Sequence, residues 1–153
     1  SRICYAFYMT TTTSPEQALA LAFGGAWSRL EQHLDHSLGA IRGISLAEYR
    51  LLRALGDAPG SQASRVDLAQ AVGLTPSGVT RALRPMEKLG IVWTVRSKRD
   101  ARLAIAALTP AGREVLDDAS GIVDDTMKAV LKRTPQVVRH AGAMTELLEE
   151  IGR

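Results

Sequence analysis

The pattern of apolar residues changes its period directly after Gly90 and returns to the helical period after Leu108. Before this glycine, apolar side chains recur at steps of three and four residues, which predicts helices. After it come two short segments, 91–95 and 103–108, that are rich in β-branched and other apolar residues. They flank the basic loop Arg96–Arg102, so we expect a β-hairpin there. The chain is therefore expected to be mainly α-helical with one small β-hairpin.

Six helices are predicted around this hairpin. Ser14–Pro15 and Thr75–Pro76 each place a capping side chain before a proline at the first helical position. Ser45 is expected to form a capping box with Glu48, and Gly73 and Gly90 are typical helix stops. A polar loop is expected between residues 56 and 65. The predicted helices cover 14 to about 39–43, 45 to about 56, 65–72, 75 to about 89, 109–131 and 134–151.

Pro85 lies well inside the predicted helix 75–89. It removes one amide donor and opposes the carbonyl of Arg81. We therefore predict a local kink, or a helix whose second half is held by the packing of Met86 and Leu89. Either arrangement would affect how far Lys88 reaches.

Length and composition are those of one soluble domain. The chain has 153 residues, of which 46% are hydrophobic and 23% charged, enough to bury a core without disulfides. We see no apolar run that could span a bilayer and no secretory signal, so a cytoplasmic location is expected. Cys4, the single cysteine, allows no intrachain disulfide. Residues 1–13 are expected to be a leader outside the folded domain, with Met9 as the natural start.

Positive charge is gathered in the middle of the chain. The formal net charge is +3, yet the segment Arg65–Arg102 holds eight basic and three acidic residues. The rest of the chain must then be slightly acidic. A basic segment of this kind is typical of a module that binds a polyanion.

The helices on either side of the tight turn Val72–Thr75 form a candidate helix-turn-helix. In the second helix, Val79, Leu83 and Met86 share one face. The opposite face carries Ser77, Arg81, Arg84 and Lys88. An isolated helix of this kind would more often be merely solvated, but the adjoining basic hairpin favours DNA binding. The candidate DNA-binding residues are Thr75, Ser77, Gly78, Thr80, Arg81, Arg84, Lys88, Arg96, Lys98, Arg99 and Arg102.

Physical chemistry gives these residues distinct roles. Arginine on such a helix can hold guanine O6 and N7 with two hydrogen bonds, while the hairpin would reach the minor groove or the phosphates. Small residues at the helix start let its positive end approach a phosphate. Asp100 is expected to bond loop amides and to hold Arg102 in place; the alternative is a simple turn-forming aspartate.

An ordered set of motifs resembles the MarR (multiple antibiotic resistance regulator) family of winged helix-turn-helix transcription regulators. The motifs are Asp67–Ala69, Gly73–Arg81, Leu89–Val92, Arg99–Arg102 and Leu108–Gly112. The resemblance implies a winged helix-turn-helix DNA-binding domain at 45–109 and a helical dimerisation region at 14–44 and 110–153. It also implies a homodimer on a palindromic operator in double-stranded DNA and, as for many members, a repressor released by a small aromatic or phenolic ligand.

Apolar residues near the C-terminus fit such a dimer. Leu131, Val137, Val138, Leu147, Leu148 and Ile151 could bury against a partner chain, or they could close the core of the monomer. A small-molecule effector, if there is one, is expected where the first two helices meet the winged domain. The candidate residues there are Trp27, His33, His36, Arg42 and Tyr49, each of which could instead have a packing or surface role.

Other functions are less well supported. His33 and His36 could share a metal with Asp35 or His140, but no cysteine or tight carboxylate cluster completes a site. We therefore expect no metal and no cofactor. The chain lacks nucleophile-elbow, phosphate-loop and dinucleotide motifs, so an enzyme is not expected. The alternatives to a sequence-specific regulator are a non-specific architectural DNA-binding protein and a metal-responsive regulator.

Overall fold

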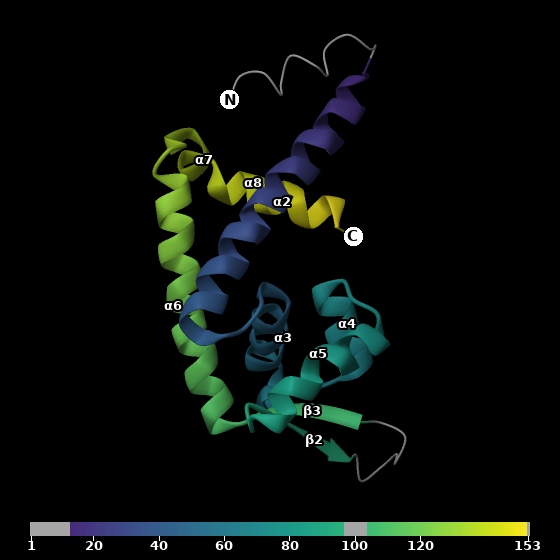
Figure 1. Cartoon of the computed structure of the whole chain (residues 1–153). Coiled ribbons are helices and arrows are strands. Elements are labelled where there is room, and N and C mark those ends of the chain that lie inside the picture. Colours follow the sequence, from purple (N-terminus) through teal and green to yellow (C-terminus); the bar gives the residue numbers. More distant parts are fainter. Residues whose placement is uncertain (1–12, 97–103, 153) are drawn as a thin grey trace. The chain divides into compact units, whose positions relative to one another are not determined.

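The computed structural model describes residues 13–96 and 104–152 (Figure 1). The fold is mainly α-helical with a small antiparallel sheet, as the sequence predicts. The chain divides into two compact units, residues 1–33 and residues 34–153. The helices are α2 (Pro15–Arg42), α3 (Leu46–Asp57), α4 (Arg65–Val72), α5 (Pro76–Lys88), α6 (Pro110–Leu131), α7 (Pro135–Arg139) and α8 (Ala141–Ile151).

Local capping signals account for most of the helix ends. Ser45 and Glu48 form the predicted capping box of α3. The hydroxyl of Thr109 accepts a hydrogen bond from the Gly112 amide and so caps α6. Gly73 ends α4 in the left-handed conformation, at φ 69°, which glycine adopts without steric cost. At the start of α2, a backbone hydrogen bond and then one from Ser14 lower the pKa of Glu16.

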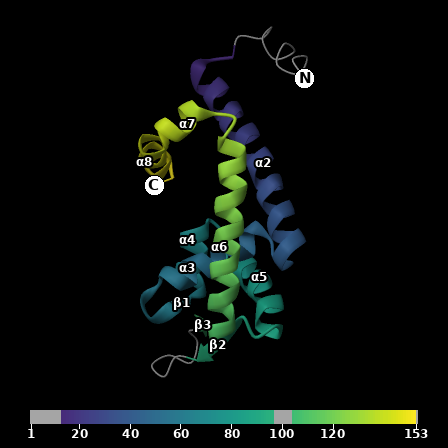
Figure 2. The ribbon, with the colours of Figure 1, turned by 90° about the vertical axis from the view of Figure 1, so that its left-hand side faces the viewer.

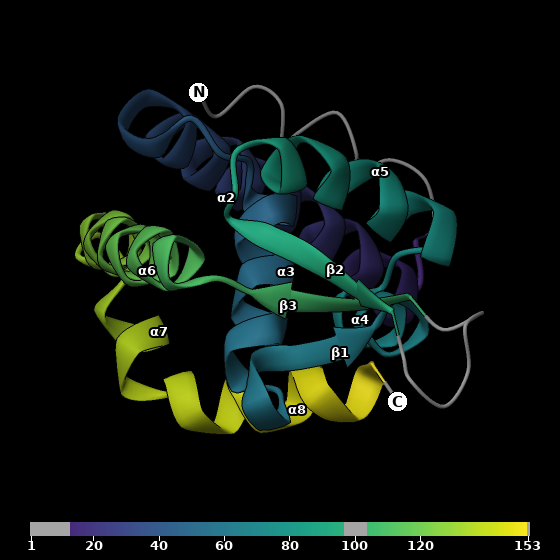
Figure 3. The same cartoon turned by 90° about the horizontal axis from the view of Figure 1, so that it is seen from below.

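The sheet has three strands, not two. The strands are β1 (Gln62–Ser64), β2 (Val92–Arg96) and β3 (Ala104–Leu108). All pairs are antiparallel, and β3 lies between β1 and β2 (Figure 3). The expected polar loop between residues 56 and 65 is therefore wrong in part, because it contains β1 and a short 3₁₀ helix, Pro59–Ser61. Three residues are too few to show a strand period, and β1 forms because β3 offers a free edge.

The core is built around α3. Its side chains Leu51, Leu52 and Leu55 are fully buried, and the helix packs against α4, α5, α6 and β3. Val92 and Ala106 from the sheet and Leu116 from α6 complete the apolar contacts. The core therefore holds α4, α5 and the sheet in one unit. Figure 2 shows α6 as one long helix that runs from β3 to α7 and α8.

Two expectations about helix continuity need correction. The helix α5 runs through Pro85 as one element, and Met86 is buried as predicted. Leu89, however, is 72% exposed, so its predicted packing is wrong: it is the C-cap, beyond the last helical turn. The single helix predicted at 134–151 is two helices, α7 and α8, which meet at His140 with φ −108° and ψ 12°. The nearest glycine, Gly142, lies two residues beyond this break, inside α8.

None of the described helices is long and apolar enough to cross a lipid bilayer.

Candidate nucleic-acid interface

A tight turn joins α4 to α5. The Leu74 amide donates to the carbonyl of Ala69 over 2.9 Å, which closes the end of α4. Thr75 then caps α5 by accepting a hydrogen bond from the Gly78 amide over 3.1 Å. A β-carbon on Gly78 would lie 3.3 Å from the Thr75 hydroxyl, so a small residue suits this first turn. The two helices form the helix-turn-helix that the sequence predicts.

The two faces of α5 differ as predicted. Val79, Leu83 and Met86 have at most 1% of their surface exposed. On the opposite face, four polar or basic side chains are exposed: Ser77, Arg81, Arg84 and Lys88. Among the described residues, none of these three cations forms an ion pair. Their positive charge is therefore available to a ligand.

The hairpin strands β2 and β3 follow α5 in the chain, and β2 packs against α5. They pair along five positions, from Val92 with Leu108 to Arg96 with Ala104. Arg96 is the last residue of β2. Four predicted loop residues, Lys98, Arg99, Asp100 and Arg102, lie outside the described residues, so their predicted roles remain predictions.

Thr80 lies at the edge of this surface and bonds within the protein. Its hydroxyl donates to the carbonyl of Pro76 over 3.0 Å and accepts from Nη1 of Arg65 over 3.3 Å. Nη2 of Arg65 lies 3.5 Å from Oε1 of Glu87 and 3.3 Å from the hydroxyl of Thr94. That hydroxyl also donates to Glu87. We call Arg65, Thr80, Glu87 and Thr94 the Arg65 cluster.

Sequence reasoning missed the Arg65 cluster. Its members lie 7 to 29 positions apart along the chain, so no local motif marks them. Arg65 and Glu87 retain only 26% and 28% of their side-chain exposure. The one available signal is Glu87, the single acidic residue of a helix whose exposed face is basic.

Comparisons with known proteins agree with this geometry. A family model described as the MarR family matches residues 42–103, which include the helix-turn-helix and β2. A MarR family regulator from Streptomyces coelicolor, solved in complex with DNA, superposes with a TM-score of 0.76 and 27% identity. That superposition covers 90% of this chain and 88% of the other. Residues 42–103 thus resemble the MarR family, and the fold is similar to that of this DNA-bound family member.

Two further relatives extend the comparison. An uncharacterised HTH-type transcriptional regulator from Bacillus subtilis is 33% identical over 92 residues, which are 60% of this chain and 55% of that protein. The match thus spans little more than half of the relative. A regulator from Bordetella bronchiseptica, whose DNA binding is regulated by 6-hydroxynicotinic acid, is 16% identical with a TM-score of 0.77. It covers 92% of this chain and 97% of its own, and at that identity the likeness concerns the fold.

MarR family members are transcription regulators rather than enzymes. The fold described above matches that of winged-helix MarR regulators.

The predicted effector residues fall in different units. Trp27 and His33 belong to the first unit, and the other three to the second. His36 is exposed, and Arg42 forms an ion pair with Asp118 of α6. The Tyr49 hydroxyl lies 3.5 Å from that of Ser120.

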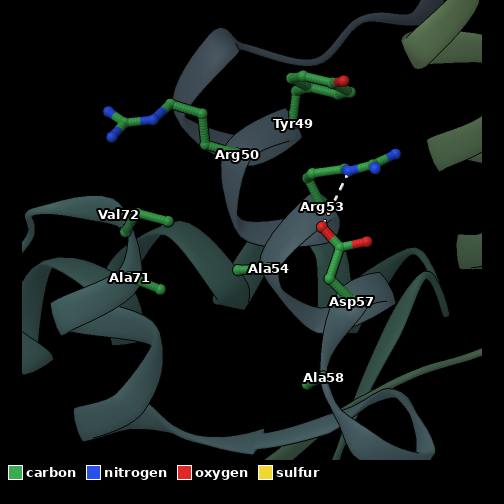
Figure 4. Close-up of a pocket in the computed structure, with 8 residues that line it drawn as sticks. All are labelled: Tyr49, Arg50, Arg53, Ala54, Asp57, Ala58, Ala71 and Val72. Carbon is green, nitrogen blue, oxygen red and sulfur yellow. Dashed lines mark hydrogen bonds and ion pairs between the residues drawn. The ribbon is translucent and has the colours of Figure 1, made fainter. Parts of the chain in front are cut away.

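Tyr49 also lines an open hollow between α3 and α4 (Figure 4). Arg53 and Asp57, one helical turn apart on α3, form an ion pair at its rim, at 3.0 Å. The other lining residues are Arg50, Ala54, Ala58, Ala71 and Val72. Of the predicted effector residues, the hollow includes Tyr49 alone.

The candidate metal residues are not assembled into a cluster. Over residues 13–96 and 104–152, no group of three or more His, Cys, Asp or Glu side chains is placed to hold a metal ion. Asp35 instead accepts a hydrogen bond from the Leu46 amide over 2.6 Å, so its carboxylate positions the start of α3.

The helices after α6 leave apolar side chains uncovered. Neither α7 nor α8 buries a residue within the described chain. Val138, Leu147, Leu148 and Ile151 are between 40% and 72% exposed. Leu131 and Val137 are half-buried. Val138, Leu147, Leu148 and Ile151 are thus too exposed to close the core of the monomer.

Proposed function

We propose that this protein is a sequence-specific, DNA-binding transcription regulator that acts as a homodimer on a palindromic operator. The observation that carries the proposal is the exposed cationic face of α5, opposite the stripe that anchors α5 in the core. In this proposal α5 is the recognition helix and the β2–β3 hairpin is the wing. The DNA-bound relative from Streptomyces coelicolor supports the assignment.

The residues of α5 would divide between reading bases and holding phosphates. Arg81 and Arg84, exposed and without an ion pair among the described residues, can each make two hydrogen bonds to a guanine edge. Thr75, Ser77 and Gly78 surround the positive end of α5, which favours a phosphate. The basic residues of the hairpin and Lys88 would add phosphate contacts and salt dependence.

The exposed apolar residues of α8 support the homodimer. Met144, Leu147, Leu148 and Ile151 recur at steps of three, one and three, so they share one helical face. Leu19, Phe23 and Trp27 of α2 are also more than 40% exposed. Burying such faces between two chains would stabilise a dimer by roughly 25 cal/mol for each Å² of apolar surface removed from water. Two recognition helices one DNA turn apart would then read a symmetric site.

We further propose that the protein represses transcription and is released by a small aromatic ligand. The candidate ligand residues remain Trp27, His33, His36, Arg42 and Tyr49. Support comes from the Bordetella bronchiseptica relative, whose DNA binding is described as regulated by 6-hydroxynicotinic acid. The ion pair of Arg42 with Asp118 is the contact that such a ligand would compete with.

One experiment tests the central proposal. Duplexes bound by the full chain are selected from a random pool, and the affinity for the recovered duplex is compared with that for a shuffled duplex at fixed salt. A regulator should prefer the recovered duplex by a factor of about a thousand or more, and the duplex should be symmetric. Equal affinities would contradict the proposal and favour an architectural DNA-binding protein. Repeating the selection with aromatic acids and phenols present tests release.

A further inference from the structure

The Arg65 cluster joins three elements at the edge of the proposed DNA-binding surface. Arg65 is the first residue of α4, Thr80 and Glu87 belong to α5, and Thr94 is the middle residue of β2. One guanidinium therefore bridges the first helix of the helix-turn-helix, the proposed recognition helix and the first wing strand. No other polar side chain among the described residues connects these three elements.

The position of Arg65 is unfavourable by local rules. A cation in the first turn of a helix is opposed by the partial positive charge of the helix N-terminus. Its Nε atom is buried and has no hydrogen-bond partner among the described residues. The three acceptors around its two terminal nitrogens therefore account for an arginine at this position, whereas the helix that it begins does not favour one.

The cluster fixes the rotation of α5 about its own axis. Thr80 and Glu87 are seven residues apart, which is nearly two turns, so they lie about 20° apart on one stripe and about 10 Å apart along the axis. This stripe lies between the buried stripe of Val79, Leu83 and Met86 and the exposed basic face. Arg84 is only about 40–60° away from it. Two attachment points on one stripe resist both rolling and tilting of the helix.

The cluster also neutralises the one carboxylate of α5. Glu87 is half-buried, and near a phosphate backbone an uncompensated carboxylate would be repelled. Arg65 and the Thr94 hydroxyl both contact Oε1 of Glu87. The acid is thereby directed toward the wing strand and away from the basic face of α5.

We propose that Arg65 is a positioning residue for DNA recognition, which sets the angle of α5 relative to the wing strand through Thr80, Glu87 and Thr94. The inference rests on the proposed function of α5. It also assigns Thr80 to the support of the recognition helix rather than to DNA. Base discrimination should therefore depend on a residue that touches no base.

The test uses the full chain with two probes: the duplex recovered by selection with the wild type, and a shuffled duplex of equal length and composition. Arg65→Met should lower the ratio of the two affinities at least about fivefold, the loss expected when a two-bond base contact is misaligned. Arg65→Lys should lower it as well, because one ammonium cannot span three acceptors. Arg53→Met, which removes the same charge from an ion pair on α3, should leave the ratio unchanged.

A double variant separates positioning from stability. In Arg65→Met/Glu87→Gln no carboxylate is left unpaired, so the free energy of unfolding should return toward that of the wild type. The affinity ratio should stay low, because the bridge to Thr80 and Thr94 is still missing. If Arg65→Met alone does not fold, this variant and Arg65→Lys carry the test.

Two results would overturn the inference. Equal weakening on both duplexes, with the salt slope reduced by about one, would make Arg65 a phosphate contact. A wild-type ratio in Arg65→Lys or in the double variant would mean that Arg65 only compensates charge. If the wild type itself did not discriminate between the duplexes, the proposed function would fail instead, so the two failures are distinguishable.

Discussion

The Thr109 hydroxyl donates a hydrogen bond to the main-chain carbonyl of Ile91 over 2.9 Å, and the Thr109 amide donates to the same oxygen over 3.1 Å. The same hydroxyl lies 2.7 Å from the carbonyl of Gly90. The turn that ends α5 is thus bound to the residue that caps α6. Movement of α6 would therefore act directly on the C-terminal end of the proposed recognition helix.

This close approach depends on Gly112. A β-carbon at this position would lie 2.1 Å from the Ile91 carbonyl oxygen and 2.7 Å from Cδ1 of Leu108. We expect Gly112→Ala to lower the free energy of unfolding by about 1–3 kcal/mol, measured by urea denaturation. Gly121→Ala is the matched control on the same helix, since nothing lies within 4 Å of its added methyl group; it should raise stability by up to about 1 kcal/mol. Equal effects of the two changes would contradict the close packing.

Arg84 is expected to read bases. Arg84→Ala should change the preferred base at one position of each half-site, at a cost of about 1–3 kcal/mol on the preferred sequence. Lys98→Ala should instead weaken all duplexes alike and lower the salt slope by about one. Arg53→Ala removes one charge outside the proposed interface and serves as the control. The measurement is the affinity of each of the three variants for a set of duplexes that differ by single base pairs. If Arg84→Ala kept the base preference of the wild type, Arg84 would not belong to the recognition surface.

Arg102 is expected to contact DNA from the wing. Arg102→Ala should weaken binding to the recovered duplex while leaving the unfolding transition within about 0.5 kcal/mol of the wild type, as is usual for a surface position. Fluorescence anisotropy with the labelled duplex and urea denaturation give the two values. Unchanged affinity would show that the wing assignment is wrong.

The exposed face of α8 is expected to form the dimer. Leu147, 60% exposed, would be fully or largely covered by a partner chain, so Leu147→Asp should bury a charge and yield monomers that bind the palindrome poorly. Val66→Asp places the same charge at a 53% exposed site on α4 and should leave the mass unchanged. Sedimentation velocity measures the mass. A dimeric Leu147→Asp protein would move the interface away from α8.

Pro85 is expected to lower the stability of α5. The helix continues through it, and an alanine there would restore an amide donor facing the carbonyl of Arg81. Pro85→Ala should therefore raise the free energy of unfolding by about 2–2.6 kcal/mol, the helix gain of about 3 kcal/mol less about 0.4–1 kcal/mol for the added freedom of the unfolded chain. A decrease in denaturant experiments would mean that the core requires the geometry that proline imposes.

Local signals in the sequence were sufficient for the helices and for the two faces of α5. The Ser45–Glu48 capping box, the glycine stop at Gly73 and the three-and-four spacing of Val79, Leu83 and Met86 all act within a few residues. The free energy of each of these features depends on backbone groups within a few residues, so the sequence alone predicts where these helices begin and end and which face of α5 is buried. The motifs that resemble the MarR family lie in the same segments.

Tertiary structure alone decided the elements whose partners are distant in the chain. The strand β1 exists because Gln62–Ser64 pairs with β3 more than forty residues later, and its own sequence is too short to show a period. Leu89 has an apolar side chain, yet it stays exposed because α5 ends before it. The break between α7 and α8 falls at His140, two residues before the nearest glycine, Gly142.

The basic face of α5 shows the same division most clearly. Periodicity determined which side chains point away from the core, because it depends only on the helical repeat. The direction in which α5 presents them depends on Arg65, whose partners Thr80, Glu87 and Thr94 lie 15, 22 and 29 positions further along the chain. Contacts between residues so far apart leave no periodic pattern in the sequence, and only the tertiary fold brings these three side chains to the guanidinium of Arg65.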